Sequence, residues 1–472
     1  MGKVLAEGSR RTVALYALCF GVLVTILDGP IVVVSLPSIV TELGLPEGAV
    51  TWVVNAYELT FGGLLLLSGR LGDVYGRRGV FLSGVALFTG ASAGCALAST
   101  PLTLLGFRAL QGIGGACVAA VALPLINSLF ATAGPRTQAI AVYGFVCAIG
   151  GGLGEVLGGT ITSALSWRWI FVINLPVGVG VYAICATLLS ENRPAKRPPP
   201  PDVAGAITIT AALTLAIYAL GATGEGHWRP IQTGCALGAA ALFVVFLYVE
   251  AQARAPMVPP QLLQVRQFNV ANSLGLLWSG AATAWFVMGP LYFRRVLGYD
   301  PLQVGLAFLP SDIVSGVFSV GLGAVVARLG TRGPLCLGLL ICAAGLACFT
   351  RTPVASRFVG DILPGMLLVG LGHGMVLNLL LLAAVTHVDS GNSGLASGAI
   401  NTTIIVGGAL GLVVLASVAR VRSEYLQHTG LNVIAAQNDG YHCAFLVGAL
   451  TFASGAALGF WALPSRARAL CS

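Results

Sequence analysis

GRLGDVYGRR, residues 69–78, is the stretch that decides the fold of this chain. Only 9% of the whole chain is Asp, Glu, Lys or Arg, yet charged residues crowd this short polar connection between two long apolar segments. Its charged residues are Arg70, Asp73, Arg77 and Arg78. Such a connection is typical of a turn at a membrane surface, in which Gly69 and Gly76 permit a tight reversal of the chain.

The composition places the apolar segments in a lipid bilayer. The hydrophobic fraction is 56% over 472 residues and the mean hydropathy is +0.89, well above what a soluble domain carries. The 63 glycines fit closely packed membrane helices, because small residues let two backbones approach. We therefore expect an all-α polytopic membrane protein.

Fourteen membrane spans are expected, because that many apolar runs are long enough to cross a hydrocarbon core of about 30 Å. An even number of spans puts both termini on one side. Of the 25 Lys and Arg residues, sixteen lie on that side, eight on the other, and Arg108 within a span. The positive-inside rule then places both termini in the cytoplasm of a cell with the protein in its plasma membrane. The expected spans are 12–36, 50–68, 79–97, 102–126, 138–163, 167–190, 203–221, 231–249, 268–291, 301–326, 334–350, 359–385, 394–419 and 440–463.

An internal repeat links the two ends of the chain. GRLGDVYGRRGVFLSG (69–84) aligns without gaps on GAVVARLGTRGPLCLG (323–338), an offset of 254 residues from Gly69 to Gly323. The same offset carries the first four spans onto the ninth to twelfth. A parallel repeat of two six-helix halves is a transporter design, in which the substrate is held near the membrane midplane.

The proline-rich stretch NRPAKRPPPPD (192–202) is the clearest linker, because four consecutive prolines cannot continue a helix. It separates six spans from eight. The domains expected from this division are an N-terminal six-helix half (1–191), a linker plus two inserted helices (192–266) and a C-terminal six-helix half (267–472).

The opening stretch and four other motifs resemble the major facilitator superfamily, specifically its fourteen-span drug:proton antiporter branch. In the fourth-span motif the residues in place are Arg108, Gln111 and Gly112. The motifs are GRLGDVYGRRG (69–79), LLGFRALQGIGGA (104–116), LDGPIVVVSLP (27–37), GGGLGEVLGG (150–159) and WRWIFVINLPVG (167–178). The resemblance implies the major facilitator fold with two inserted helices, and export of a small amphiphilic molecule such as an antibiotic.

Two positions depart from the pattern of that branch. The fifth span often reads Gly-Pro where this chain has Gly154-Glu155, and the thirteenth has the apolar stretch TTIIVGG (402–408) where polar residues are expected. Both departures bear on substrate and coupling, and not on the family.

Asp73 is the residue of the opening stretch that membrane orientation does not explain. The arginines suit the positive inner face of the membrane, whereas an acid is not needed there. The thirteenth span begins near Ser393 on the same face with unpaired N–H groups, so Asp73 can dock there and stabilise the state closed to the cytoplasm. The expected gate motif comprises Gly69, Asp73, Gly76, Arg77 and Arg78.

Four ionisable residues inside expected spans form the candidate coupling site: Asp28, Glu58, Arg108 and Glu155. Each is costly in lipid unless paired or hydrated. Counted along the helices at about 1.5 Å per residue, all four lie at similar depth in the outer half of the membrane. Three acids beside one arginine cannot all stay ionised cheaply, so one of them can carry a proton.

Structural roles remain open for three of the four. Arg108 can serve only as an ion-pair partner, Glu58 can be hydrated near the interface, and Asp28 can cap N–H groups freed by the kink at Gly29-Pro30.

Glu155 is the strongest candidate, because glycines surround it. Gly150, Gly154 and Gly158 form one close-packing face, and Gly159 lies beside the acid on the neighbouring face. The weaker candidates are Tyr57, Gln111, Asp312 and His373. A helix–helix hydrogen bond is favoured for His373 over a proton relay, and the rings of Tyr57, Trp278 and Trp285 suit any flat substrate.

The favoured function is a secondary transporter that exports an amphiphilic molecule in exchange for protons. No GxxxxGK[ST] loop that would bind ATP occurs, and no metal-ligand pair or catalytic domain is visible, so we expect neither an enzyme nor a cofactor. The expected partners are substrate, protons and lipid, without nucleic acid, for a monomer. The alternatives are an importer or metabolite exporter on the same fold and, more remotely, a membrane enzyme or sensor.

Overall fold

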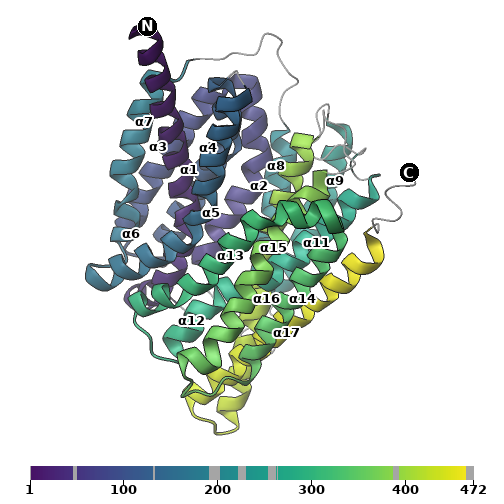
Figure 1. The fold of residues 1–472 in the computed structure, drawn as a ribbon. Helices are drawn as coiled ribbons and strands as arrows, with labels where there is room; N and C mark the ends of the chain where they lie inside the picture. Colours follow the sequence, from purple (N-terminus) through teal and green to yellow (C-terminus); the bar gives the residue numbers. More distant parts are fainter. Residues whose placement is uncertain are drawn as a thin grey trace. The chain divides into compact units, whose positions relative to one another are not determined.

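The computed structural model describes residues 2–45, 50–130, 133–190, 202–221, 230–253, 262, 264–385 and 393–463. Every regular element in those ranges is helical, and Figure 1 shows the helices of each half of the chain running alongside one another. The all-α class expected from the sequence is therefore confirmed for the described residues.

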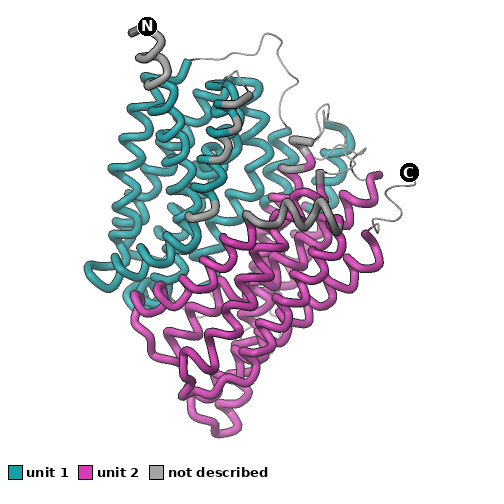
Figure 2. The backbone as a smooth tube through the Cα atoms, viewed as in Figure 1, with its two compact units in different colours: residues 1–210, 243–257 teal, residues 211–242, 258–472 magenta. Residues whose placement is uncertain are grey.

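The chain divides into two compact units, coloured separately in Figure 2. Unit 1 comprises residues 1–210 and 243–257, and unit 2 comprises residues 211–242 and 258–472. The helices of unit 1 are α1 (Gly2–Leu43), α2 (Trp52–Tyr75), α3 (Arg77–Ala96), α4 (Pro101–Leu129), α5 (Ala133–Ala164), α6 (Trp169–Val172) and α7 (Asn174–Leu188). Those of unit 2 are α11 (Arg266–Phe286), α12 (Met288–Arg295), α13 (Pro301–Leu329), α14 (Arg332–Cys348), α15 (Leu363–Val385), α16 (Ser393–His428) and α17 (Val433–Ala462), with the short turns η2 (Phe349–Arg351) and η3 (Phe358–Ile362).

The inserted helices α8 (Val203–Gly221) and α9 (Pro230–Gln252) each contribute residues to both units. The boundaries 1–191, 192–266 and 267–472 stay a prediction, and the proline-rich linker lies outside the described residues except for Asp202.

Each of the fourteen expected spans coincides with a helix or a pair of consecutive helical segments. Among the described residues, twelve helical stretches are long and apolar enough to cross a membrane. The two that are not among them, α2 and α5, contain 24 and 32 residues. At about 1.5 Å per residue both have the length of a span, but α2 also carries charged residues. The count of fourteen spans stays a prediction.

Five helix pairings recur in the two units, which supports the repeat seen in the sequence. In unit 1, α1 packs on α5 and α7, α4 packs on α2 and α3, and α3 also packs on α7. In unit 2, α11 packs on α16 and α17, α15 packs on α13 and α14, and α14 also packs on α17. The second set reproduces the first in chain order, so the repeat is one of packing as well as of sequence.

The turn that opens the repeat is made by one glycine in each unit. Gly76 separates α2 from α3 with φ of 105°, and Gly330 separates α13 from α14 with φ of 73°. A residue with a side chain rarely adopts such an angle, and the two glycines are related by the same offset of 254 residues. The expected role of Gly69 in the reversal is wrong, because α2 continues through Gly69 to Tyr75 and a single residue of positive φ suffices for the turn.

Glycines bring α5 directly against the backbone of α1. A Cβ atom built on Gly158 would lie 2.7 Å from the carbonyl oxygen of Ile31, and one on Gly154 would lie 3.0 Å from that of Leu27. One on Gly150 would lie 2.6 Å from a methyl carbon of Ile26. A side chain at Gly158 or Gly154 would therefore push the two backbones apart, and one at Gly150 would displace the side chain of Ile26.

Substitution at Gly158 tests this packing. We expect Gly158→Ala to lower the apparent melting temperature of the detergent-purified protein, because overpacking of this kind costs about 1–3 kcal/mol. Gly151→Ala on the same helix is the matched control, since a Cβ atom there would meet nothing within 4 Å. Equal melting temperatures for the two variants would contradict the close contact between α1 and α5.

Candidate functional site

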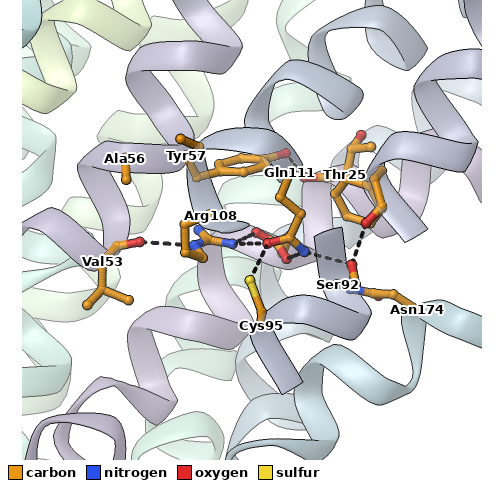
Figure 3. Close-up of polar contacts among 12 residues, drawn as sticks. Thr25, Val53, Ala56, Tyr57, Ser92, Cys95, Arg108, Gln111 and Asn174 are labelled. Carbon is orange, nitrogen blue, oxygen red and sulfur yellow. Dashed lines mark hydrogen bonds and ion pairs between the residues drawn. The ribbon is translucent and has the colours of Figure 1, made fainter. Parts of the chain in front are cut away.

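A buried ion pair between Asp28 and Arg108 joins α1 to α4 in the interior of unit 1, and Figure 3 shows Arg108 with its polar neighbours. The Asp28 carboxylate accepts hydrogen bonds at both oxygens, from Arg108 Nη1 at Oδ2 and from Gln111 Nε2 at Oδ1, the latter at 2.7 Å. Arg108 Nη1 also donates to Gln111 Oε1 at 2.8 Å. These three side chains, which we call the polar triad, are at most 1% exposed. The capping role considered for Asp28 is therefore replaced by a direct contact with α4.

Helix α2 fixes the position of the Arg108 guanidinium group. Nε donates to the carbonyl oxygen of Val53 at 3.0 Å, and Cζ lies 4.6 Å from the ring centroid of Tyr57. Tyr57 is itself anchored, since its hydroxyl donates to the carbonyl oxygen of Thr25 on α1 at 2.9 Å. Arg108 Nη2 is buried without a hydrogen-bond partner among the described residues. The guanidinium group thus keeps one nitrogen, with its two N–H groups, uncommitted beside its ion pair.

Two polar residues that the sequence did not single out extend the polar triad to α3 and α7. Ser92 Oγ accepts from Gln111 Nε2 at 2.9 Å and from Asn174 Nδ2 at 3.3 Å. Its own hydroxyl donates to the carbonyl oxygen of Phe88 at 2.8 Å. A polar Asn174 inside an apolar span was a usable signal, whereas Ser92 stands in a run of small residues that resembles ordinary packing.

The charges of the polar triad depend on each other because water does not reach them. Moving a carboxylate or a guanidinium ion from water into a medium of low dielectric constant is strongly unfavourable, and removing one partner of a buried pair costs about 3–5 kcal/mol. A proton arriving at Asp28, or a new partner for Arg108, therefore changes the stability of the whole arrangement. Such a site can couple protonation to movement of helices.

Glu58 and Glu155 lie outside the polar triad. Glu58 is half-buried on α2 and makes no hydrogen bond or ion pair in the part of the chain that is described. Glu155 is 4% exposed on α5, and its neighbour Gly154 packs against Leu27 and Pro30. The structure thus places Glu155 on the helix that packs beside Asp28, but the coupling roles of all four charged residues stay a prediction.

The gate motif shows local contacts on unit 1. Asp73 Oδ1 accepts from Arg77 Nη2 at 3.0 Å, one helical turn away, and both side chains are 42% exposed. Arg78 Nη2 donates to the carbonyl oxygen of Ala186 at 2.5 Å and so ties the start of α3 to α7. The docking of Asp73 at the first turn of α16 stays a prediction.

The two weaker candidates in unit 2 lie on different helices. Asp312 lies on α13, and His373 lies on α15 between two aromatic rings of α11. The hydrogen bond favoured for His373 is not found in the described part of the chain, where ring contacts take its place.

Unit 2 lacks the chemistry of the polar triad at the equivalent helix positions. Gly112 packs on α2 at Tyr57 and Thr60, and Gly370 packs on α13 at Ser311. Aligning α15 on α4 at these two glycines, an offset of 258 residues because the connection before α15 is longer, pairs Met366 with Arg108 and Val369 with Gln111. The two residues are buried and apolar, so the ion pair belongs to unit 1 alone among the described residues.

A comparison with protein families agrees with this architecture. The sequence profile described as Major Facilitator Superfamily matches residues 18–412. The chain belongs to the major facilitator superfamily. Members of this superfamily are multi-pass membrane transporters, which agrees with the twelve membrane-length helical stretches found among the described residues.

The relatives it resembles include exporters. The cephamycin export protein CmcT of Amycolatopsis lactamdurans is 36% identical over 88% of this chain and 86% of its own length. The puromycin resistance protein of Streptomyces alboniger is 34% identical over 93% of this chain and 89% of its own length. The multidrug transporter protein MdtP of Bacillus subtilis is 31% identical over 90% of this chain and 78% of its own length.

Solved structures share the fold at low sequence identity. The POT family transporter PepTSo has a TM-score of 0.69 at 14% identity, covering 94% of this chain and 98% of its own. The nucleoside transporter NupG has a TM-score of 0.67 at 12% identity, covering 96% and 100%. At these identities the likeness concerns the fold alone.

Removing one charge of the polar triad tests its electrostatics. We expect Arg108→Met to lower the melting temperature and the yield of folded protein sharply, because Asp28 is left buried without its cation. The double variant Asp28→Leu/Arg108→Met should regain most of that stability while losing transport. Arg422→Met is the control, since its ion pair with Asp439 is 42% and 38% exposed and water can replace the lost partner. A stable Arg108→Met protein would contradict the coupling of the two charges.

Proposed function

We propose that this chain is a proton-coupled antiporter of the plasma membrane that exports a small amphiphilic molecule, such as an antibiotic, by alternating access. The observation that carries the proposal is the dry polar triad inside membrane helices of a major facilitator protein. A buried carboxylate paired with a guanidinium group is not required for stability, because two apolar side chains of similar volume would stabilise the same helix contact at least as well. It is suited to gaining and losing a proton.

Support for export comes from the relatives, whose names describe export of cephamycin, resistance to puromycin and multidrug transport. Export of an antibiotic is a direct way to resist it, so all three descriptions support export of a small molecule from the cell. Substrate entry from the cytoplasm and proton entry from outside are part of the same proposal. So are cytoplasmic termini, a monomeric protein and a function without catalysis.

The coupling step can be written with the residues of unit 1. With Asp28 ionised, Arg108 Nη1 and Gln111 Nε2 hold it, and α1 and α4 are bound together at this level. A proton on Asp28 removes the charge that Arg108 neutralises, while Val53 and Tyr57 retain the guanidinium group on α2. The contact between α1 and α4 is then weakened, and the helices can change their packing. Release of the proton restores it.

The energy source is tested by efflux from cells that lack their own drug pumps. We expect efflux of puromycin or another exported antibiotic to stop when a protonophore collapses the proton gradient while cellular ATP stays high. An imposed pH gradient should drive the same transport in proteoliposomes. Efflux that survives the protonophore and depends on sodium would contradict proton coupling, and uptake in place of efflux would favour the importer alternative.

The role of Glu155 is tested by removing only its charge. Glu155→Gln keeps the size of the side chain, so we expect a folded protein that still binds substrate but releases fewer protons when substrate is added. Proton release is measured on the detergent-purified protein beside a binding titration, with Glu424→Gln on α16 as the control. Release equal to that of the wild type would make Glu155 a packing residue and leave Asp28 and Glu58 as the carriers.

A further inference from the structure

The motif WRWIFVINLPVG (167–178) turns one buried face toward the interior of unit 1, and the polar triad accounts for only part of it. Residues four and seven apart lie on the same side of a helix. At that spacing the motif buries Trp167, Phe171, Asn174 and Gly178. Asn174 belongs to the network around the polar triad. The two aromatic residues of the same face, Trp167 and Phe171, have no role in the coupling step as written above.

Phe171 is a second ring beside the guanidinium group of Arg108. Its centroid lies 6.0 Å from Arg108 Cζ, compared with 4.6 Å for Tyr57. Phe171 is fully buried on α6, whereas Tyr57 is on α2. An aromatic ring within about 6 Å attracts a cation, and the attraction is stronger where water is excluded. Phe171 therefore helps to fix the guanidinium group from an element that makes no hydrogen bond to it.

Trp167 braces Phe171 and is itself anchored to the C-terminal end of α1. The two rings meet edge-on, with a centroid distance of 6.2 Å and an interplanar angle of 90°. Trp167 Nε1 donates to Glu42 Oε2 at 2.6 Å. Trp167 is 2% exposed, whereas the Glu42 side chain is 49% exposed. A carboxylate at the protein surface thus anchors a pair of rings that ends at Arg108.

Arg168 fixes the other oxygen of the same carboxylate. Its Nη1 donates to Glu42 Oε1, and its Nη2 donates to the carbonyl oxygen of Ala98 at 3.1 Å. Ala98 lies in the short connection between α3 and α4. The end of α1 is in this way tied to the segment that leads into α4. We call Glu42, Trp167, Arg168 and Phe171 the aromatic brace.

We propose that Trp167 and Phe171, anchored by Glu42, are positioning residues that hold the Arg108 guanidinium group against Asp28. They thereby set how readily Asp28 takes up a proton. If the guanidinium group is held less closely, the ionised carboxylate loses part of its counter-charge and the protonated form is favoured. This inference rests on the proposed proton coupling and adds to it the residues that tune it.

The two rings of the aromatic brace are suitable for a test because neither of them titrates. Substituting Trp167 or Phe171 changes no charge, so a moved titration of Asp28 reports a moved partner. Helix α6 and the start of α7 carry no titratable side chain. At the level of Asp28 the surrounding helices contribute, besides Arg108, Tyr57 and Glu58 on α2, Cys95 on α3 and Glu155 on α5.

The test is an infrared titration of the full-length protein in lipid nanodiscs, without substrate. The carbonyl stretch of protonated Asp28 is identified as the band that is absent from the Asp28→Leu/Arg108→Met double variant. We expect Phe171→Leu to move the midpoint of this band up by about half a pH unit or more, which is about threefold in proton affinity. Trp167→Phe keeps the ring and loses the donor to Glu42, so it should give a smaller shift in the same direction.

Glu42→Leu separates the aromatic brace from a direct electrostatic effect by the sign of the shift. Glu42 follows Asp28 by 14 residues on α1, which is about 21 Å along the helix. Removing a distant negative charge by itself favours the ionised form of Asp28, so the midpoint would fall or stay. Removing the anchor of Trp167 loosens Arg108, so we expect the midpoint to rise.

Phe81→Leu is the matched control, because this ring of unit 1 is also fully buried. It packs on α1 at Gly21, where a Cβ atom would lie 2.9 Å from Phe81 Cζ, and it makes no contact with the aromatic brace among the described residues. We expect a lower melting temperature, as for Phe171→Leu, with an unmoved midpoint.

The outcomes distinguish this inference from the proposed function. A midpoint unchanged in Phe171→Leu, or moved equally in Phe81→Leu, would overturn the positioning role and leave Asp28 as a proton carrier. A midpoint unchanged or lowered in Glu42→Leu would overturn the anchor at the surface. A wild-type Asp28 that takes up no proton would overturn both the carrier and its positioning.

Discussion

The structure of unit 1 depends on the buried contact between Asp28 and Arg108, because neither charge can be left alone in a membrane. Lipid offers no water to solvate an orphaned carboxylate, so α1 and α4 must stay in register as long as both groups are ionised. The surrounding side chains serve this constraint. Gln111 bridges the two partners, while Val53 and Tyr57 hold the guanidinium group from α2. One ion pair and the side chains around it thus connect α1, α2 and α4 of the same unit.

That arrangement needs helices whose backbones nearly touch, and glycine permits this contact because it has no side chain. Gly84 and Gly114 pack against each other's carbonyl oxygens between α3 and α4, and Gly338 and Gly372 do the same between α14 and α15. A Cβ atom on Gly115 would lie 2.9 Å from the hydroxyl oxygen of Tyr57, so only glycine lets that ring approach α4. Association in lipid lacks a hydrophobic driving force, and close packing of small residues takes its place. Glycine contacts at corresponding positions therefore give the two units the same helix packing.

The sequence predicted what depends on local pattern and failed where the outcome depends on packing. The helical class, the repeat and the turn at Gly76 follow from hydropathy and from a backbone angle that only glycine adopts readily. Depth along the helices placed Asp28 and Arg108 at one level, but depth cannot say which way a side chain points. Glu58 therefore shared their level without sharing their contact. Ser92 was missed for the same reason, since a buried serine shows its partner only once α3 is packed on α4.

The difference between the units is more informative than their likeness. Because glycine contacts fix the backbone of α15 as they fix that of α4, the side chains on these helices are free to differ without altering the fold. Unit 1 carries a buried charge pair on these helices, whereas unit 2 has apolar residues at the equivalent positions and rings around His373. The exchange of protons for a small molecule that we propose requires two dissimilar sites. A duplicated scaffold with diverged side chains provides them, because each site can be tuned to its own ligand while both remain attached to helices that pack in the same way.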